Sequence, residues 1–189
     1  PLALRWTALE PGTIMEAVYG VNRASNWEEF REAVRLWDTP AQNLIYADIE
    51  GNIGYQTPGN IPIRAADHTG LLPVPGWTDE YEWKGFIPFD NLPRILNPER
   101  DYIATANQAV VPLEYYDQLA EQLGDEFGAD SNYVISRLWD DGYRGQRINQ
   151  LLEELAPHSI ATFQQIQGDN LDGSAAEIMP FIAALEIED

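Results

Sequence analysis

Two polar residues in the second half of the chain are of types that could take part in catalysis. Asn107 closes a run of small residues in the sequence DYIATANQ. We expect Asp101–Thr105 to form a short strand that presents Asn107 and Gln108 at its tip. A carboxamide in such a position, with small neighbours that leave room, could donate a hydrogen bond to an oxyanion as it forms. The simpler interpretation is an asparagine in a turn, where this residue type is common.

Arg144 is the second of these residues. It lies in the sequence DDGYRGQRI, near the start of a helix that we expect over Gly142–Leu155. The helix dipole does not favour a cation at that end. A partner carboxylate or a functional role would account for its position. From the residues alone, a turn asparagine and a salt-bridged arginine are the simpler interpretation of Asn107 and Arg144.

The histidines and the acidic pairs carry less chemical information. His68 and His158 lie in loop-like sequence without a serine or cysteine partner, and we interpret both as structural. Neighbouring acids such as Asp140 and Asp141 are expected by chance in a chain this acidic. We interpret them as solvated surface.

Metal-binding and phosphate-binding motifs are weak. Asp125, Glu126 and Asp130 lie close together between glycines, but their spacing is not that of an EF-hand, which needs alternating ligands and a closing glutamate. The sequence GNIGY at Gly51–Tyr55 lacks the glycine spacing of a phosphate loop. Its glycines need only a backbone reason.

Composition limits the class of protein. The 189 residues are 44% hydrophobic and 11% aromatic, which is typical of one globular domain or a large piece of one. With 31 acidic and 11 basic residues the formal net charge is −20, so the surface repels nucleic acid and anionic membranes. Cysteine is absent from the sequence, which excludes disulfides and thiolate chemistry. No apolar run approaches the roughly 20 residues of a membrane span.

The first half is expected to contain a strand, two helices and a hairpin. We predict a strand over Leu2–Ala8, a helix capped by Thr13 that ends near Asn22, and a second helix capped by Ser25 or Asn26. The buried face of that second helix is expected to consist of Trp27, Phe30, Ala33, Val34 and Trp37. A hairpin pairs Leu44–Asp48 with Asn52–Gln56 around a turn that contains Gly51.

The remainder is expected to be loop and then helix. Prolines punctuate residues 60–98, where we predict ordered loop rather than long elements. Its aromatic residues are expected to pin the loop to the core by simple packing: Trp77, Tyr81, Trp83, Phe86 and Phe89. Helices are predicted over Leu113–Leu123, Asp130–Leu138, Gly142–Leu155, Ser159–Gln167 and Ser174–Glu186.

Several segments, in this order and at this spacing, resemble the penicillin acylase (penicillin amidase) family of N-terminal nucleophile hydrolases. They are NLIYADIEGNIGYQTPGNIPIR, HTGLLPVPGW, EWKGFIPFDNLP, NPERDYIATANQ and DDGYRGQRI. WTAL near the start, NWEEF in the second predicted helix and LLEE after Arg144 extend the resemblance, which runs from about Leu2 to Pro180. The matching region is the middle of the family's large β-subunit.

The resemblance implies an α+β fold that belongs to the αββα arrangement of N-terminal nucleophile hydrolases. Residues 1–189 would be a single fragment of the β-subunit. Residues 1–112 would hold short antiparallel strands, a hairpin, loop and two helices, and residues 113–189 would be mainly helical. The chain begins with Pro1 and stops within the helical pattern FIAALEIED, so we expect that it was cut from something longer.

Family members are made as precursors that are cleaved to expose an N-terminal serine, which attacks the amide with its own α-amino group as base. By resemblance that serine lies upstream of Pro1. We therefore expect the partners of this chain to be the α-subunit, the rest of the β-subunit and a small amide substrate. The fragment alone is expected to be inactive.

Two residues match functional positions of the family. Asn107 matches its oxyanion asparagine, and Arg144 matches its active-site arginine, whose proposed role is to hold the polar network of the site. No metal or cofactor is expected in this fragment. Calcium is possible in the intact enzyme, where the matching position is Tyr133, with Asp130 or Asn132 as alternatives.

The function implied is hydrolysis of a linear amide, of the penicillin or acyl-amine type, to a carboxylic acid and an amine. An alternative substrate class is the acyl-homoserine lactones, and the acyl pocket that would separate the two is expected upstream. A different alternative is a non-catalytic structural or binding module derived from the family. The resemblance also implies a periplasmic or extracellular protein.

Overall fold

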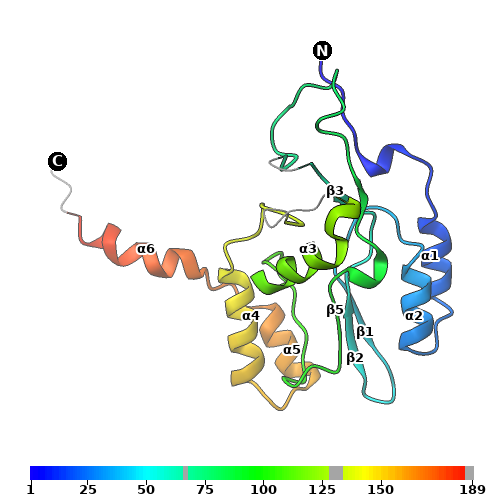
Figure 1. The fold of residues 1–189 in the computed structure, drawn as a ribbon. Coiled ribbons are helices and arrows are strands. Elements are labelled where there is room, and N and C mark those ends of the chain that lie inside the picture. Colours follow the sequence, from blue (N-terminus) through cyan, green and yellow to red (C-terminus); the bar gives the residue numbers. More distant parts are fainter. Residues whose placement is uncertain (66–67, 128–133, 186–189) are drawn as a thin grey trace. The chain divides into compact units, whose positions relative to one another are not determined.

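A computed structural model describes residues 1–65, 68–127 and 134–185, apart from the side chains of residues 125–127. Its contacts form two compact units that interleave along the sequence (Figure 1). Unit 1 comprises Pro1–Ile103 and Val111–Arg137, and unit 2 comprises Ala104–Val110 and Leu138–Asp189. Loop 104–110 belongs to unit 2 because it contacts Asp140, Arg144 and Gly145.

Two short helices begin unit 1 after a 3-10 turn, η1 (Thr7–Leu9). Helix α1 (Ile14–Val21) packs against α2 (Trp27–Val34). Asn26 caps α2 by accepting a hydrogen bond from the backbone N–H of Glu29 at 2.8 Å, as predicted. Thr13 stands at the predicted start of α1, but its hydroxyl donates to the carbonyl of Leu36 instead of capping the helix.

Three strands form an antiparallel sheet in the order β1-β2-β5 (Figure 1). They are β1 (Leu44–Ala47), β2 (Ile53–Gln56) and β5 (Arg94–Leu96). The β1–β2 hairpin confirms the prediction, with Tyr46 opposite Gly54. Its turn is closed by Asp48, whose side chain accepts from the backbone N–H of both Glu50 and Asn52. Gly51 supplies the positive φ of 90° that the turn needs.

The segment between β2 and β5 is mainly ordered loop, as predicted. It contains two two-residue strands that pair with each other, β3 (Pro62–Ile63) and β4 (Gly85–Phe86), and a 3-10 turn, η2 (Phe89–Asn91). Helix α3 (Leu113–Phe127) packs on this loop. The buried cluster between them is aliphatic: Ile61, Ile63, Ile87, Leu92, Leu119 and Leu123.

The aromatic residues of the loop contribute less to the core than predicted. Phe89 does pack against this cluster and against a second one formed by Phe30, Val34 and Tyr46. Trp77, in contrast, is 86% exposed, so the prediction that it pins the loop is wrong. Aliphatic side chains next to β3 and β4 fill that role.

Two predicted strands and one predicted helix are wrong. Residues 1–6 form no strand, and Leu2 and Leu4 are exposed, because no strand in the described part of the chain pairs with them. Residues 101–105 form none either, and Asp101 has a positive φ of 56°; the strand lies earlier, at β5. Residues 134–138 of the helix predicted over Asp130–Leu138 are not helical, and its first residues lie outside the described ranges.

Unit 2 contains the three other predicted helices, α4 (Tyr143–Glu154), α5 (Ile160–Gln167) and α6 (Gly173–Ala183). Ser159 and Thr162 form a reciprocal capping box at the start of α5. Asp172 caps α6 by accepting from the backbone N–H of Ala175 at 3.0 Å. None of the described helices is long and apolar enough to cross a membrane. The presence of both small antiparallel sheets and helices confirms the α+β class.

Candidate functional site

Asn107 lies in a tight turn of loop 104–110 rather than at the end of a strand. Its φ is 63°, in the left-handed region that asparagine tolerates better than most residues. The side-chain oxygen of Gln108 accepts a hydrogen bond from the backbone N–H of Ala106 at 2.6 Å and so braces the turn. The carbonyl of Asn107 accepts from the backbone N–H of Asp140 at 2.9 Å. The turn is thereby tied to the segment that leads into α4.

The two predicted site residues contact each other directly through the guanidinium of Arg144. Its Nη2 donates to the side-chain oxygen of Asn107 at 2.6 Å and to the carbonyl of Ala106 at 2.7 Å. Because a guanidinium only donates, the carboxamide of Asn107 must turn its oxygen toward Arg144 and its NH2 group away. In the ranges of the chain that the structure describes, no hydrogen bond uses that NH2 group, and the residue is exposed.

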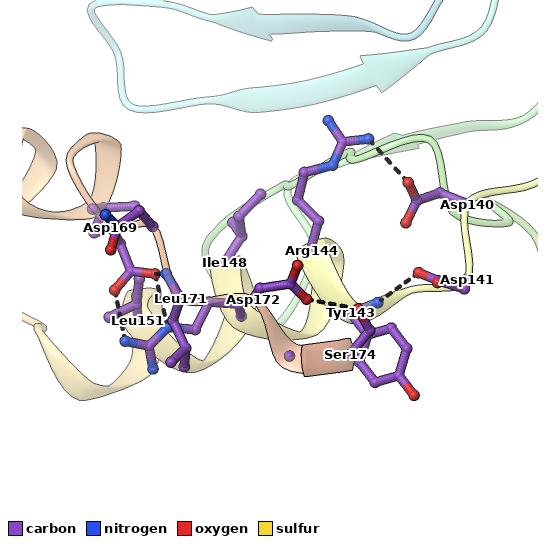
Figure 2. A pocket seen from close by; sticks show the side chains of 14 residues that line it. Asp140, Asp141, Tyr143, Arg144, Ile148, Leu151, Asp169, Leu171, Asp172 and Ser174 are labelled. Carbon is purple, nitrogen blue, oxygen red and sulfur yellow. Dashed lines mark hydrogen bonds and ion pairs between the residues drawn. The ribbon is translucent and has the colours of Figure 1, made fainter. Parts of the chain in front are cut away.

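The partner carboxylate expected for Arg144 is Asp140, whose Oδ2 lies 3.5 Å from Nη2 (Figure 2). The other oxygen of Asp140 accepts from the backbone N–H of Gly142 at 3.2 Å, and Asp141 accepts from that of Tyr143 at 3.4 Å. The Asp140 carboxylate offsets the unfavourable position of Arg144 in the first turn of α4. Asp140 is exposed, as expected, but it also pairs with Arg144; the available signal was its spacing of four residues from Arg144.

Gln108 was expected at the tip beside Asn107, but its sequence context predicted no role for it. Its side chain lies against α4 at Gly145, where a Cβ atom would approach Cδ and Oε1 of Gln108 to 3.3 Å. Gly145 is buried and allows the loop to lie this close to the helix. A glycine near the start of a polar helix was the only local sign of this contact.

A hollow of about 390 Å³ lies beside Arg144, between α4 and the segment that leads into α6 (Figure 2). Its apolar lining is Ile148, Leu151, Ile166 and Leu171. One side of the hollow is lined by a bidentate ion pair, in which Arg147 donates to the two oxygens of Asp169 at 3.0 and 2.7 Å. This pair lowers the pKa of the Asp169 carboxyl and raises that of the guanidinium. The hydrogen bond to Glu177 likewise raises the pKa of the Tyr143 hydroxyl.

The histidines and Ser174 have partners of their own. His158 lies against Phe163, at 5.2 Å between ring centroids. Ser174 lines the hollow and donates its hydroxyl to Asp172. His68, in unit 1, packs edge-on against Tyr81. Among the described residues, no three His, Asp or Glu side chains are grouped to hold a metal ion. Asp125, Glu126, Asp130, Asn132 and Tyr133 lie outside the described side chains.

Comparisons with a family model and with individual proteins agree on one family. The family model for penicillin amidase matches residues 1–189. Penicillin G acylase of Escherichia coli is 31% identical over 149 residues, which cover 79% of this chain and 16% of that protein. The acyl-homoserine lactone acylase QuiP of Pseudomonas fluorescens (strain Pf0-1) is 34% identical over 151 residues, covering 74% and 18%.

A solved structure shows the same fold. The thermostable penicillin G acylase from Alcaligenes faecalis matches with a TM-score of 0.68 at 23% identity, over 94% of this chain and 30% of that one. This match confirms the predicted relation to the N-terminal nucleophile hydrolase fold. The chain spans less than a fifth of the length of the two curated relatives just described. On the family match over its whole length, the chain belongs to the penicillin amidase family of amidohydrolases.

Proposed function

We propose that this chain supplies the side-chain donor of the oxyanion hole in an intact amidohydrolase that cleaves acylated amines. The observation that carries the proposal is the carboxamide of Asn107. Its oxygen is held by Arg144 at 2.6 Å, and its NH2 group is exposed and uncommitted among the described residues. A donor that is fixed in place before the reaction can stabilise an oxyanion without reorganising.

The proposed reaction needs a nucleophile from outside residues 1–189. An N-terminal serine of the parent protein would attack the amide carbonyl, and its own α-amino group would take the hydroxyl proton. The carbonyl π electrons then become the oxyanion, which accepts a hydrogen bond from Nδ2 of Asn107. Collapse of this intermediate expels the amine with the transferred proton. Water then hydrolyses the acyl-serine and releases the carboxylic acid.

Arg144 is proposed as a positioning residue in this scheme. Its contact with the oxygen of Asn107 is a charge-assisted hydrogen bond, the stronger class of such bonds. Withdrawal of electron density from that oxygen makes the N–H groups on the other side of the amide better donors. The guanidinium charge also favours a developing anion.

The test uses the intact parent enzyme with phenylacetyl-p-nitroanilide as the probe. Asn107→Ala is expected to lower kcat about 10²- to 10³-fold and to leave KM nearly unchanged, because the lost bond forms only in the transition state. Asn97→Ala is a matched control, since Asn97 also has a positive φ, of 49°, but its side chain braces β2 through Ile53. That variant should lose stability and retain its kcat. A normal kcat in Asn107→Ala would remove Asn107 from the oxyanion hole.

Turnover also separates the enzyme from a non-catalytic module of the same family. The parent protein should release p-nitroaniline, whereas the 189-residue chain by itself should not. Complete absence of turnover from the parent, with both amides and acyl-homoserine lactones, would favour the module.

The substrate class is proposed as acylated amines, in two forms. The names of the relatives include penicillin acylases and acyl-homoserine lactone acylases. Benzylpenicillin and N-octanoyl-homoserine lactone are therefore the discriminating pair, compared by kcat/KM in the intact enzyme. We also propose that the parent protein is exported to the periplasm or the extracellular space, which cell fractionation tests.

A further inference from the structure

Asp140 contacts both the Asn107 turn and the start of α4. Its backbone N–H donates to the carbonyl of Asn107 at 2.9 Å. Its Oδ1 accepts from the N–H of Gly142 at 3.2 Å, and its Oδ2 lies 3.5 Å from Nη2 of Arg144. Arg144 in turn reaches the side chain of Asn107. One residue thus connects the loop, the helix terminus and the arginine.

We propose that the Asp140 carboxylate is a positioning residue that keeps Arg144 behind the carboxamide of Asn107 during amide hydrolysis. The inference rests on the proposed function, because it assigns a role within the same site. It goes beyond that function by naming a residue that does not touch the substrate and yet sets how well the oxyanion donor is held.

The geometry indicates that Asp140 acts on Arg144 by charge rather than by a short hydrogen bond. Nη2 carries two hydrogen atoms, and the acceptors at 2.7 and 2.6 Å, the carbonyl of Ala106 and the side chain of Asn107, occupy both. The carboxylate at 3.5 Å lies outside the range of a short charge-assisted bond. It can still attract the guanidinium.

This attraction matters because Arg144 is exposed apart from its two hydrogen bonds to the Asn107 turn. Its side chain is 56% exposed, and a long exposed arginine has many rotamers available. Its position in the first turn of α4 is also unfavourable in the field of the helix dipole. A counter-charge four residues earlier lies beside the guanidinium (Figure 2). It restricts the side chain to the orientation that meets Asn107.

A second effect of the carboxylate has the opposite sign. A negative charge near the site disfavours the oxyanion and would slow the reaction. The oxyanion, however, binds on the NH2 side of the carboxamide, with Arg144 on its oxygen side and Asp140 next to Arg144. Solvent around these exposed groups screens the longer interaction more strongly than the shorter one. Positioning therefore outweighs repulsion.

The test measures kcat and KM of the intact enzyme with phenylacetyl-p-nitroanilide. Asp140→Asn keeps the backbone bond to Asn107 and an acceptor for Gly142, and removes only the charge. It is expected to lower kcat about two- to fivefold, the range of an exposed ion pair, with KM unchanged. Asp140→Glu keeps the charge and should retain kcat within about twofold. Asp141→Asn is the matched control, because Asp141 accepts from Tyr143 and does not contact Arg144; its kcat should be unchanged.

A double-mutant cycle provides the readout that a purely structural role would not give. With Arg144→Leu already present, Asp140→Asn should cause no further loss of kcat. Additive losses, an unchanged kcat, or a higher kcat in Asp140→Asn would each overturn the inference. If Asn107→Ala lowers kcat while Asp140→Asn does not, the proposed function stands and only the role of Asp140 is lost. A normal kcat in Asn107→Ala would remove the proposed function itself.

Discussion

The side-chain oxygen of Asn107 lies 2.6 Å from Nη2 of Arg144, although the two residues are 37 positions apart in the sequence. The distance is at the short end for hydrogen bonds of an arginine with an oxygen. Because the same Nη2 also binds the carbonyl of the preceding residue, Ala106, it fixes both the backbone and the side chain of the turn. The orientation of one amide group thus depends on one guanidinium.

Replacement of Arg144 should therefore impair catalysis without impairing substrate binding. Arg144→Leu is expected to lower kcat about 10- to 100-fold, since hydrogen bonds to charged groups contribute about 1.5–3 kcal/mol. Arg144→Lys keeps the charge but not the planar fork and should be intermediate. Steady-state kinetics of the intact enzyme measure both. Arg100→Leu, which changes an exposed arginine in unit 1, should behave as the unmodified enzyme.

Asn107→Asp separates the donor role of Asn107 from its structural role. An aspartate keeps an oxygen for Arg144, so the turn should remain intact and the melting temperature should not fall. It lacks the NH2 group, and its negative charge repels an oxyanion. The expected loss of kcat is at least that of Asn107→Ala, about 10²-fold or more. A folded Asn107→Asp enzyme with near-normal kcat would contradict the donor role.

Local sequence signals predicted the elements whose stability is local. Asn26, one of the two predicted caps, and Ser159, the predicted first residue of a helix, stand at helix starts that the structure confirms. Gly51 marked the hairpin turn. Each of these features requires residues only a few positions apart, so the pattern in the sequence is sufficient.

Contacts between residues far apart in the sequence explain the misplaced strand and the missed site contacts. Arg94–Leu96 forms a strand because β2 offers it an edge, and Asn97, 44 residues from Ile53, secures the pairing through its side chain. No property of Asp101–Thr105 predicts that the partner of β2 lies a few residues earlier. Similarly, the family resemblance identified Asn107 and Arg144, but the contacts of Asp140 and Gln108 depend on how the loop meets α4.

Two leucines of α3 provide a test of the core in unit 1. Leu119 is 2% exposed and belongs to the aliphatic cluster, whereas Leu113, on the same helix, is 78% exposed. Leu119→Ala is expected to lower the free energy of unfolding by about 2–5 kcal/mol, because it leaves a cavity. Leu113→Ala should change it by less than about 0.5 kcal/mol. Urea unfolding of the intact protein measures both, and equal effects would contradict the packing of α3.

The ion pair of Arg147 with Asp169 predicts how acid affects unit 2. Hydrogen bonds from Arg147 place the pKa of the Asp169 carboxyl below its usual value of 3.8 in the folded chain. A depressed carboxyl pKa stabilises the fold fully above the unfolded pKa, about 3.9, and this contribution is lost as the pH falls through the lower folded value. Asp169→Asn should therefore be less stable than the unmodified protein at pH 6.

The difference in stability between Asp169→Asn and the unmodified protein should shrink as the pH falls below about 4. Protonation then removes the charge of Asp169 from the unmodified protein, and the variant already lacks that charge. Melting temperatures between pH 2 and pH 6 measure this difference. Arg147→Gln, which removes the other partner, should show the same convergence. If the difference in melting temperature between Asp169→Asn and the unmodified protein stays constant from pH 2 to pH 6, the carboxylate contributes by shape and not by charge. Asp169 would then have an ordinary pKa beside Arg147.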